Sequence, residues 1–349
     1  MENQKPTIDS DLNIQVAVND ILNTIERIRE REIIAKRFGL FARKETLEQV
    51  GELLNITRER VRQLEKSIIA NLKYNPHNRL PHIKLIEEKF TKYLKELGNV
   101  ARVKDLGAKF SHVNDHIHQA QITFLSHLSP KFVIIKNDNH HHHSLALANI
   151  HKDNHDVRHN IDSIVKHIAE VGEPISSQQI HLNLKKFNVK HVHALALISK
   201  KLAHLNQHWG LHHWSSVNPK NIRDKIFIVL KETNKPMHFS KIAQSIHDSS
   251  FKRNKVSVQA IHNELIKDRR FVLVGRGIYA LRQWGYKKGT VSDVIYEILK
   301  KSGKPMDRYD IVKEVLKKRQ VKQTTVLLNL QCKPIFKRLE KTGQYILNE

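Results

Sequence analysis

Residues 46–72 read TLEQVGELLNITRERVRQLEKSIIANL, and this stretch predicts two short helices joined by a tight turn. Thr46, followed three residues later by Gln49, has the form of a capping box, in which each side chain satisfies a free backbone N–H of the first turn. Asn55 is a turn residue, and Thr57 can cap the second helix. A short helix, a turn and a longer helix in this order are typical of a helix-turn-helix.

The apolar residues of this stretch recur at helical spacing and predict one buried face on each helix. On the first helix this face contains Leu47, Val50 and Leu54, with Gly51 where the second helix can approach closely. On the second helix it contains Val61, Leu64, Ile68 and Leu72. The outer face of the second helix is left with Arg58, Glu59, Arg62, Gln63 and Lys66. Side chains of these types near the start of a second helix can reach base edges in the major groove.

Together with the preceding Arg29–Glu32 and Arg37–Leu40, the stretch closely resembles the fourth conserved region of bacterial primary sigma factors, over about residues 20–75. In that family the region reads the −35 promoter element and docks on the flap of RNA polymerase. The resemblance implies that DNA bases are faced by Arg58, Glu59, Arg62 and Gln63, and that phosphates are approached by Thr57, Arg60 and Lys66. The alternative, a solvated charged helix start, does not explain why caps, spacing and exposed pattern agree.

The formal net charge of +25 favours a polyanionic partner, and double-stranded DNA is the leading candidate. Residues 24–74 carry 12 Lys/Arg and 8 Asp/Glu, so most of the excess positive charge lies outside the helix-turn-helix. A merely soluble basic protein is the alternative.

No stretch approaches the roughly 18 apolar residues of a membrane-spanning helix, and the start of the chain, MENQKPTIDSDL, is polar. The single cysteine, Cys332, rules out an intramolecular disulfide and a cysteine-based zinc site. We therefore expect a cytoplasmic protein without a membrane partner.

Residues 80–349 contain four similar segments, in which a turn follows one amphipathic helix and precedes another. In the third segment, two further helices are followed by Phe271–Val274 and Ile278–Leu281 around a Gly-Arg-Gly turn, which predicts a β-hairpin. Three helices and a hairpin are the winged-helix arrangement. The predicted domains are a polar arm (1–19), the helix-turn-helix (20–75) and four winged-helix-like units. The first of these units (82–147) is degraded, and the other three comprise residues 158–216, 220–286 and 290–349.

The third unit, from Lys231–Phe239 onward, resembles a HARE-type winged helix, best over residues 221–284. That family includes the N-terminal domain of the RNA polymerase delta subunit, and the resemblance implies contact with DNA or polymerase. A scaffold or dimerisation module is the alternative. Short connectors predict a string of domains with limited play. The expected fold class is therefore mainly α with small β-hairpins, a helix-turn-helix followed by tandem winged-helix units.

Twenty-four histidines raise the question of a metal site, above all the run His140–His143. Adjacent residues on one loop rarely enclose an ion, so we expect a polar hairpin tip, solvent-facing imidazoles and no metal or other cofactor. His191 and His193 have no carboxylate or cysteine nearby in sequence to complete a site. Many histidines would, however, gain positive charge on mild acidification and tighten phosphate binding.

The nearest approach to a nuclease pattern is Asp307 with Glu314 and Lys317, which a solvated helix face explains better. No phosphate-binding loop, nucleophile elbow or dinucleotide fingerprint occurs in the sequence. We predict a protein that is not an enzyme and has no small-molecule substrate.

The sequence favours a bacterial transcription protein related to sigma factors, which reads promoter-like duplex DNA, docks on RNA polymerase, or does both. Only 6% of the residues are aromatic, and nothing resembles the aromatic-rich helix that melts the −10 element, so we do not expect a complete initiation factor. The alternatives are an RNA polymerase accessory subunit that acts by protein contacts, and the DNA-targeting subunit of a restriction or defence complex.

Overall fold

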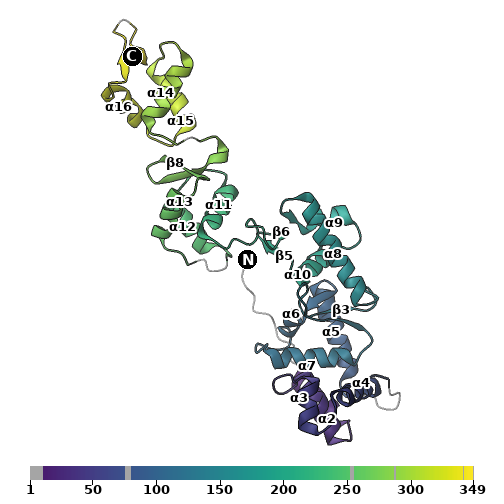
Figure 1. Cartoon of the computed structure of the whole chain (residues 1–349). Helices are drawn as coiled ribbons and strands as arrows, with labels where there is room; N and C mark the ends of the chain where they lie inside the picture. Colours follow the sequence, from purple (N-terminus) through teal and green to yellow (C-terminus); the bar gives the residue numbers. More distant parts are fainter. Residues whose placement is uncertain (1–10, 75–79, 252–254, 287, 341, 349) are drawn as a thin grey trace. The chain divides into compact units, whose positions relative to one another are not determined.

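The computed structural model describes residues 11–74, 80–251, 255–286, 288–340 and 342–348. The chain divides into two compact units, Met1–His213 and Trp214–Glu349, and each is considered by itself (Figure 1). The predicted fold class, mainly helical with small antiparallel sheets, is confirmed. None of the described helices is long and apolar enough to cross a membrane.

The first unit opens with α1 (Ile14–Asn23), α2 (Ile28–Phe38), α3 (Leu47–Leu54) and α4 (Arg58–Tyr74). The Asn13 side chain caps α1 by accepting a hydrogen bond from the Val16 N–H at 3.2 Å. Leu12 precedes the helix, and Ile14 and Val18 lie within it. All three are buried, because they lie on the same apolar face. The polar arm predicted for residues 1–19 is therefore wrong for residues 14–19, which are part of a core helix.

The local structure around α3 and the following turn agrees with the prediction. The Thr46 hydroxyl accepts from the Gln49 N–H at 3.2 Å, and the Gln49 side chain accepts from the Thr46 N–H at 2.8 Å, so the capping box is confirmed. Asn55 ends α3 in the left-handed conformation, at φ 51°. A Cβ atom on Gly51 would lie 2.7 Å from the Ile56 carbonyl oxygen, so the tight turn requires glycine at this position.

The predicted buried faces are also confirmed. Ile33, Val50 and Val61 are fully buried and hold α2, α3 and α4 together. Ile68 is buried in a larger neighbouring core, where Leu64 and Leu72 pack against it.

Two repeats of one element order follow in the first unit. The first repeat contains α5 (Ile83–Leu97), β1 (Val100–Arg102), α6 (Val103–Gly107), α7 (His116–His127), β2 (Phe132–Ile135) and β3 (Ser144–Leu147). The second repeat contains α8 (Asn154–Val171), β4 (Ile175–Ser176), α9 (Ser177–Leu184), α10 (Val189–Ile198), β5 (Leu202–Leu205) and β6 (His208–Leu211). In both antiparallel sheets the last strand lies between the other two, in the orders β1-β3-β2 and β4-β6-β5. The three helices and the hairpin expected of these segments are present.

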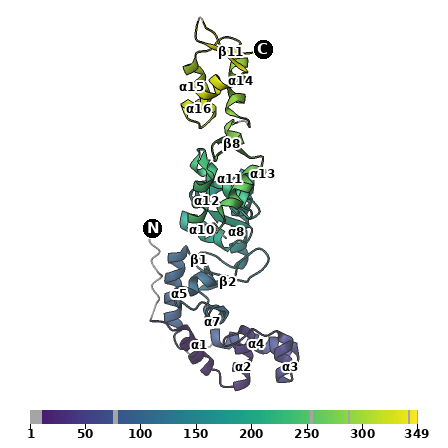
Figure 2. The ribbon, with the colours of Figure 1, turned by 90° about the vertical axis from the view of Figure 1, so that its left-hand side faces the viewer.

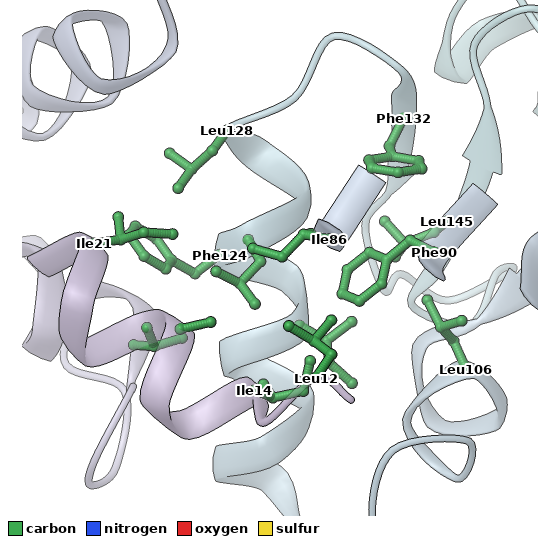
Figure 3. Packing of buried hydrophobic residues seen from close by; sticks show 14 of the residues in the cluster. Leu12, Ile14, Ile21, Ile86, Phe90, Leu106, Phe124, Leu128, Phe132 and Leu145 are labelled. Atoms are coloured by element: carbon green, nitrogen blue, oxygen red, sulfur yellow. The ribbon is translucent and has the colours of Figure 1, made fainter. Parts of the chain in front are cut away.

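The four N-terminal helices share one hydrophobic core with the first repeat. Figure 3 shows Ile21 of α1 beside Phe124 of α7, with Ile14 of α1 and Ile86 of α5 in the same cluster. The Phe38 ring meets Phe124 edge to face, with 5.3 Å between ring centroids. Figures 1 and 2 both show α2, α3 and α4 gathered next to α7. Here the expected string of separate domains is wrong, because one apolar core spans the boundary; residues 75–79 of the predicted connector lie outside the described residues.

The histidine run joins the first repeat to the second. His141 forms an isolated β-bridge with Ser199, and the His142 N–H donates to the Ile198 carbonyl oxygen at 2.9 Å. The Asp138 carboxylate accepts from the backbone N–H groups of His140 and His141 at 2.8 and 2.7 Å. His141 is only 5% exposed, so the prediction of a solvent-facing tip is wrong for this residue.

The second unit contains two further repeats. The third repeat contains α11 (Ile222–Thr233), β7 (Met237–His238), α12 (Phe239–Asp248), α13 (Val258–Lys267), β8 (Phe271–Gly275), β9 (Ile278–Leu281) and the short 3₁₀ helix η1 (Arg282–Trp284). The fourth repeat contains α14 (Val291–Ser302), α15 (Arg308–Lys318), α16 (Gln323–Cys332), β10 (Phe336–Arg338) and β11 (Tyr345–Leu347). The third repeat has the strand order β7-β9-β8. In the fourth, a single bridge between Met306 and Tyr345 stands where the other repeats have their first strand.

Backbone contacts tie the third repeat to the fourth. The buried Arg319 guanidinium donates to the carbonyl oxygens of Leu273 and Gly289. The Gln320 N–H donates to the Val274 carbonyl oxygen at 3.1 Å. A cation enclosed by carbonyl oxygens and an added backbone hydrogen bond resist separation of the two repeats. Within this unit, too, the repeats are not separate domains.

Candidate nucleic-acid interface

The outer face of α4 carries the side chains that the sequence singles out for base contact. Arg58, Glu59, Arg62 and Gln63 are exposed and lie within the first two turns of the helix. The exposed Thr57 precedes them, and its hydroxyl accepts from the Arg60 N–H at 3.2 Å, which confirms the predicted N-cap. Since Val61 occupies the buried side, the charged side of α4 faces outward.

Two ion pairs organise this face in the free protein. The Arg62 guanidinium donates to both carboxylate oxygens of Glu59, at 2.7 and 2.9 Å. This hydrogen bond lowers the pKa of Glu59 and raises the pKa of Arg62. Arg58 contacts the Glu48 carboxylate of α3 at 3.1 Å. The side chains are 55–72% exposed, and exposed ion pairs contribute little to stability, so both pairs can open when a ligand competes for them.

Two of the three residues predicted to approach phosphates, Arg60 and Lys66, differ in their surroundings. The Arg60 guanidinium lies 3.4 Å from the Gln63 side-chain oxygen, which is a long hydrogen bond between exposed groups. Lys66 is exposed and lines a cleft beside α4. The predicted base-facing and phosphate-facing residues therefore lie on one continuous surface of one helix.

This cleft, of about 1230 Å³, separates α4 from the first repeat, and we call it the α4–α7 cleft. One wall comprises α4, the end of α2 and the loop between α2 and α3. The other wall comprises α7, the end of β2 and the loop between β2 and β3. Phe38 and His127, one from each wall, meet edge to face with 5.4 Å between ring centroids.

Positive side chains predominate along the cleft. Its lining contains two carboxylates, Glu65 and Asp115, and six Lys/Arg residues: Arg37, Arg43, Lys44, Arg62, Lys66 and Lys136. Arg37 is paired with Glu65 at 2.8 Å. Arg43, Lys44, Lys66 and Lys136 are exposed and have no ion-pair partner among the residues that the structure describes. The cleft therefore has an excess of positive charge, which suits an anionic ligand.

The histidines of the cleft respond to this charge. Burial, together with the nearby positive charge of Lys136, lowers the pKa of His127 to about 4. Burial also lowers the pKa of His143, and Lys44 adds to the shift. Lys44 lies on the first wall and His143 on the second, so the electrostatic field of one wall reaches the other. Sequence reasoning missed the cleft because its walls come from residues far apart in the chain.

A second group that sequence reasoning missed is a buried chain of side chains in the second repeat. His191 contacts Asn99 at 3.1 Å through Nδ1 and His151 at 3.0 Å through Nε2, and His151 contacts Asp156 at 3.1 Å through Nδ1. All three contacts can be hydrogen bonds if both rings are neutral. Asn99 then donates to His191, His191 donates to His151, and His151 donates to Asp156. The group therefore fits a hydrogen-bonded structural link between the first and second repeats.

Burial lowers the pKa of many of the histidines. His191 is 2% exposed, so the prediction of solvent-facing imidazoles is wrong for it. Burial lowers the pKa of His118, His127, His142, His143, His151, His191, His193 and His204. The expected gain of positive charge on mild acidification is wrong for His127 and His191, whose pKa values are lowered to about 4. Across the described parts of the chain, no three His, Cys, Asp or Glu side chains are placed to hold a metal ion.

The acidic residues of the fourth repeat have structural partners. The Asp307 carboxylate accepts from the Tyr309 N–H at 2.8 Å and caps α15. Glu314 pairs with Lys317 on an exposed helix face, as the sequence predicts.

The geometry of α3, the turn and α4 defines a helix-turn-helix domain, and comparison with known proteins gives its family. The family described as sigma-70, region 4, matches residues 28–73. The RNA polymerase sigma factor RpoD of Helicobacter pylori is 44% identical over 70 residues, and SigA of a Nostoc species is 35% identical over 71 residues. SigA1 of Synechococcus elongatus is 41% identical over 59 residues. Residues 28–73 thus form a sigma-70 region 4 domain, related to the sigma factors of RNA polymerase.

This similarity spans only 59–71 residues. It covers 17–20% of the chain and only 10–18% of the length of these three relatives. The remaining residues, which include all four repeats, need a functional argument of their own.

Proposed function

We propose that this chain is a DNA-binding bacterial transcription protein that reads promoter-like duplex DNA through α4. The observation that carries the proposal is the row of exposed Arg58, Glu59, Arg62 and Gln63 on the second helix of a sigma-70 region 4 domain. Arg can form a paired hydrogen bond with guanine, Gln with adenine, and Glu can accept from cytosine. Arg58 and Arg62 lie one turn apart on the helix, with Glu59 and Gln63 in the adjacent row. Together these rows suit a short mixed base sequence.

Docking on RNA polymerase belongs to the same proposal, because the relatives of this domain are polymerase sigma factors. The four repeats, of which the third resembles a HARE-type winged helix, then add contacts to DNA or polymerase. Their contribution is chiefly electrostatic, since most of the +25 net charge lies in them. A protein of this kind works where the DNA is, in the cytoplasm, and needs neither a cofactor nor catalytic residues. We do not expect these 349 residues to open promoters unaided.

Selection from a randomised duplex library tests the role of α4. Arg62→Ala should weaken binding to the best site roughly ten- to a hundredfold and relax preference at one or two positions, because a paired contact to a base is lost. Lys66→Gln should weaken all sequences alike and lower the salt slope by about one unit, because phosphate contacts carry no sequence information.

Arg27→Ala is the matched control for this test. Arg27 is also an exposed arginine paired with a glutamate three residues away, Glu30, but it precedes α2 and lies outside α4. If Arg62→Ala selects the same site with the same discrimination as Arg27→Ala, then α4 is not the base reader. In that case the domain serves polymerase docking, and the chain is an accessory subunit that acts by protein contacts.

Purification of the tagged chain from its host separates the remaining alternatives. Polymerase subunits in the purified complex support the transcription role. A nuclease in place of polymerase would instead assign the chain to a restriction or defence complex as its DNA-targeting subunit.

A further inference from the structure

The α4–α7 cleft continues the predicted DNA-facing surface of α4. Arg62 and Lys66 belong both to that surface and to the lining of the cleft. DNA that meets the first turns of α4 therefore has a sugar–phosphate backbone beside the mouth of the cleft. The opposite wall comes from the first repeat, which lies outside the region 4 domain.

The size and charge of the cleft restrict what can occupy it. A volume of about 1230 Å³ exceeds the range of roughly 300–1,000 Å³ that is usual for small-molecule sites. Four exposed cations without an ion-pair partner among the described residues come from three separate segments: the α2–α3 loop (Arg43 and Lys44), α4 (Lys66) and the residue after β2 (Lys136). Cations distributed along an open cleft match a polymer with regularly spaced negative charges.

The wall formed by the first repeat is held in position. The Gln121 side chain in α7 donates to the Leu40 carbonyl oxygen at 2.9 Å, across the boundary between the two walls. Phe38 packs against Phe124 and His127 of α7. The backbone that carries Lys136 is therefore fixed relative to α4. When Lys136 binds a ligand, only its side chain has to become ordered, which keeps the entropy cost of binding small.

We propose that the α4–α7 cleft holds the sugar–phosphate backbone of duplex DNA flanking the bases read by α4, so that the first repeat extends the DNA-binding surface of the region 4 domain. This inference rests on the proposed function, because it assumes that α4 meets duplex DNA. It adds Arg43, Lys44 and Lys136 to the phosphate contacts, and it assigns the first repeat to DNA and not to polymerase.

The double variant Lys44→Gln/Lys136→Gln tests the cleft, with the duplex selected by the wild-type protein as probe. Both lysines are exposed and lie on opposite walls, so the folded structure should tolerate the change. The slope of log affinity against log salt should fall by about two units, since each lost phosphate contact removes roughly 0.9. Hydroxyl-radical protection should disappear on one flank of the site and persist over the bases read by α4. Sequence preference should not change.

Two further variants serve as controls. Lys84→Gln/Lys95→Gln removes two exposed lysines from α5 of the same repeat, neither of which lines the cleft. It should keep the flank protection and most of the salt slope. Lys44→Arg/Lys136→Arg keeps the charges and should restore both readouts.

The outcomes separate this inference from the proposed function. If the wild-type protein selects a site and Lys44→Gln/Lys136→Gln matches Lys84→Gln/Lys95→Gln, the cleft does not hold DNA, although α4 still reads it. If the cleft variant keeps its DNA footprint but loses binding to core RNA polymerase, the cleft holds an acidic protein segment and the inference is wrong. If the wild-type protein selects no duplex at all, the proposed function fails and the inference fails with it.

Discussion

At the scale of single residues, Gly51 shows how tightly the turn between α3 and α4 is packed. Its missing Cβ would lie 2.7 Å from the Ile56 carbonyl oxygen, a backbone atom that cannot rotate away. In an open helix, replacing glycine by alanine stabilises by about 1 kcal/mol. We predict the opposite sign here: Gly51→Ala should destabilise the chain by about 1–3 kcal/mol, because the added methyl forces the turn apart.

Urea unfolding of the full chain, followed by circular dichroism, measures this effect. The variant should unfold at a lower urea concentration, with the change confined to the transition that includes the first unit. If the urea midpoint of Gly51→Ala is unchanged or raised, position 51 does not lie as close to the Ile56 carbonyl oxygen as the structure indicates.

At the scale of helices, α7 and α10 carry histidines that the fold keeps neutral. Burial lowers the pKa of His127 and of His191 to about 4, against an unfolded value near 6.5. Between those two values the unfolded chain binds a proton that the folded chain does not. Stability should therefore fall as the pH is lowered from 6.5 towards 4, by up to about 1.4 kcal/mol per pH unit for each histidine.

The variant His127→Phe isolates one of these histidines. Phenylalanine keeps an aromatic ring against Phe38 but cannot take up a proton. Thermal unfolding midpoints between pH 7 and 4.5 should fall less steeply for this variant than for the wild-type chain. Parallel curves for the two proteins would mean that His127 is not the titrating group.

At the scale of the whole molecule, the charge is divided unequally between the two units. Trp214–Glu349 carries 29 Lys/Arg and 12 Asp/Glu, whereas Met1–His213 carries 31 and 23. The second unit is thus the more basic of the two, and the proposed base-reading surface of α4 lies in the other. This division suggests that one unit supplies base recognition and the other non-specific attraction to DNA.

The fragment 214–349 should therefore bind duplex DNA of any sequence, with an affinity that falls steeply as salt is raised. A cut at residue 80 is unsuitable for this test, because it would split the core that α1 to α4 share with the first repeat. Fluorescence anisotropy with an arbitrary duplex, between about 50 and 200 mM salt, gives the slope. No measurable binding at the low end of that range would assign the third and fourth repeats to protein contacts.

Much of the candidate interface follows from local sequence rules. The capping box at Thr46, the turn at Asn55, the buried Val61 and the exposed Arg58 and Arg62 were all predictable. Each depends on residues within one or two helical turns of one another. The cleft was not predictable, because Lys44 and Lys136 are brought together only by packing between α2 and α7.

Residue spacing and composition are enough to predict the helix-turn-helix, its family, the repeated order of helices and strands, and the excess of positive charge. These features depend on residues that are near one another along the chain. Packing between distant segments is what brings α1 into the core, buries His141 and His191, and makes the first repeat the second wall of a basic cleft. Those outcomes arise because apolar side chains far apart in sequence share one core. A local sequence pattern does not indicate against which other helix each helix will pack.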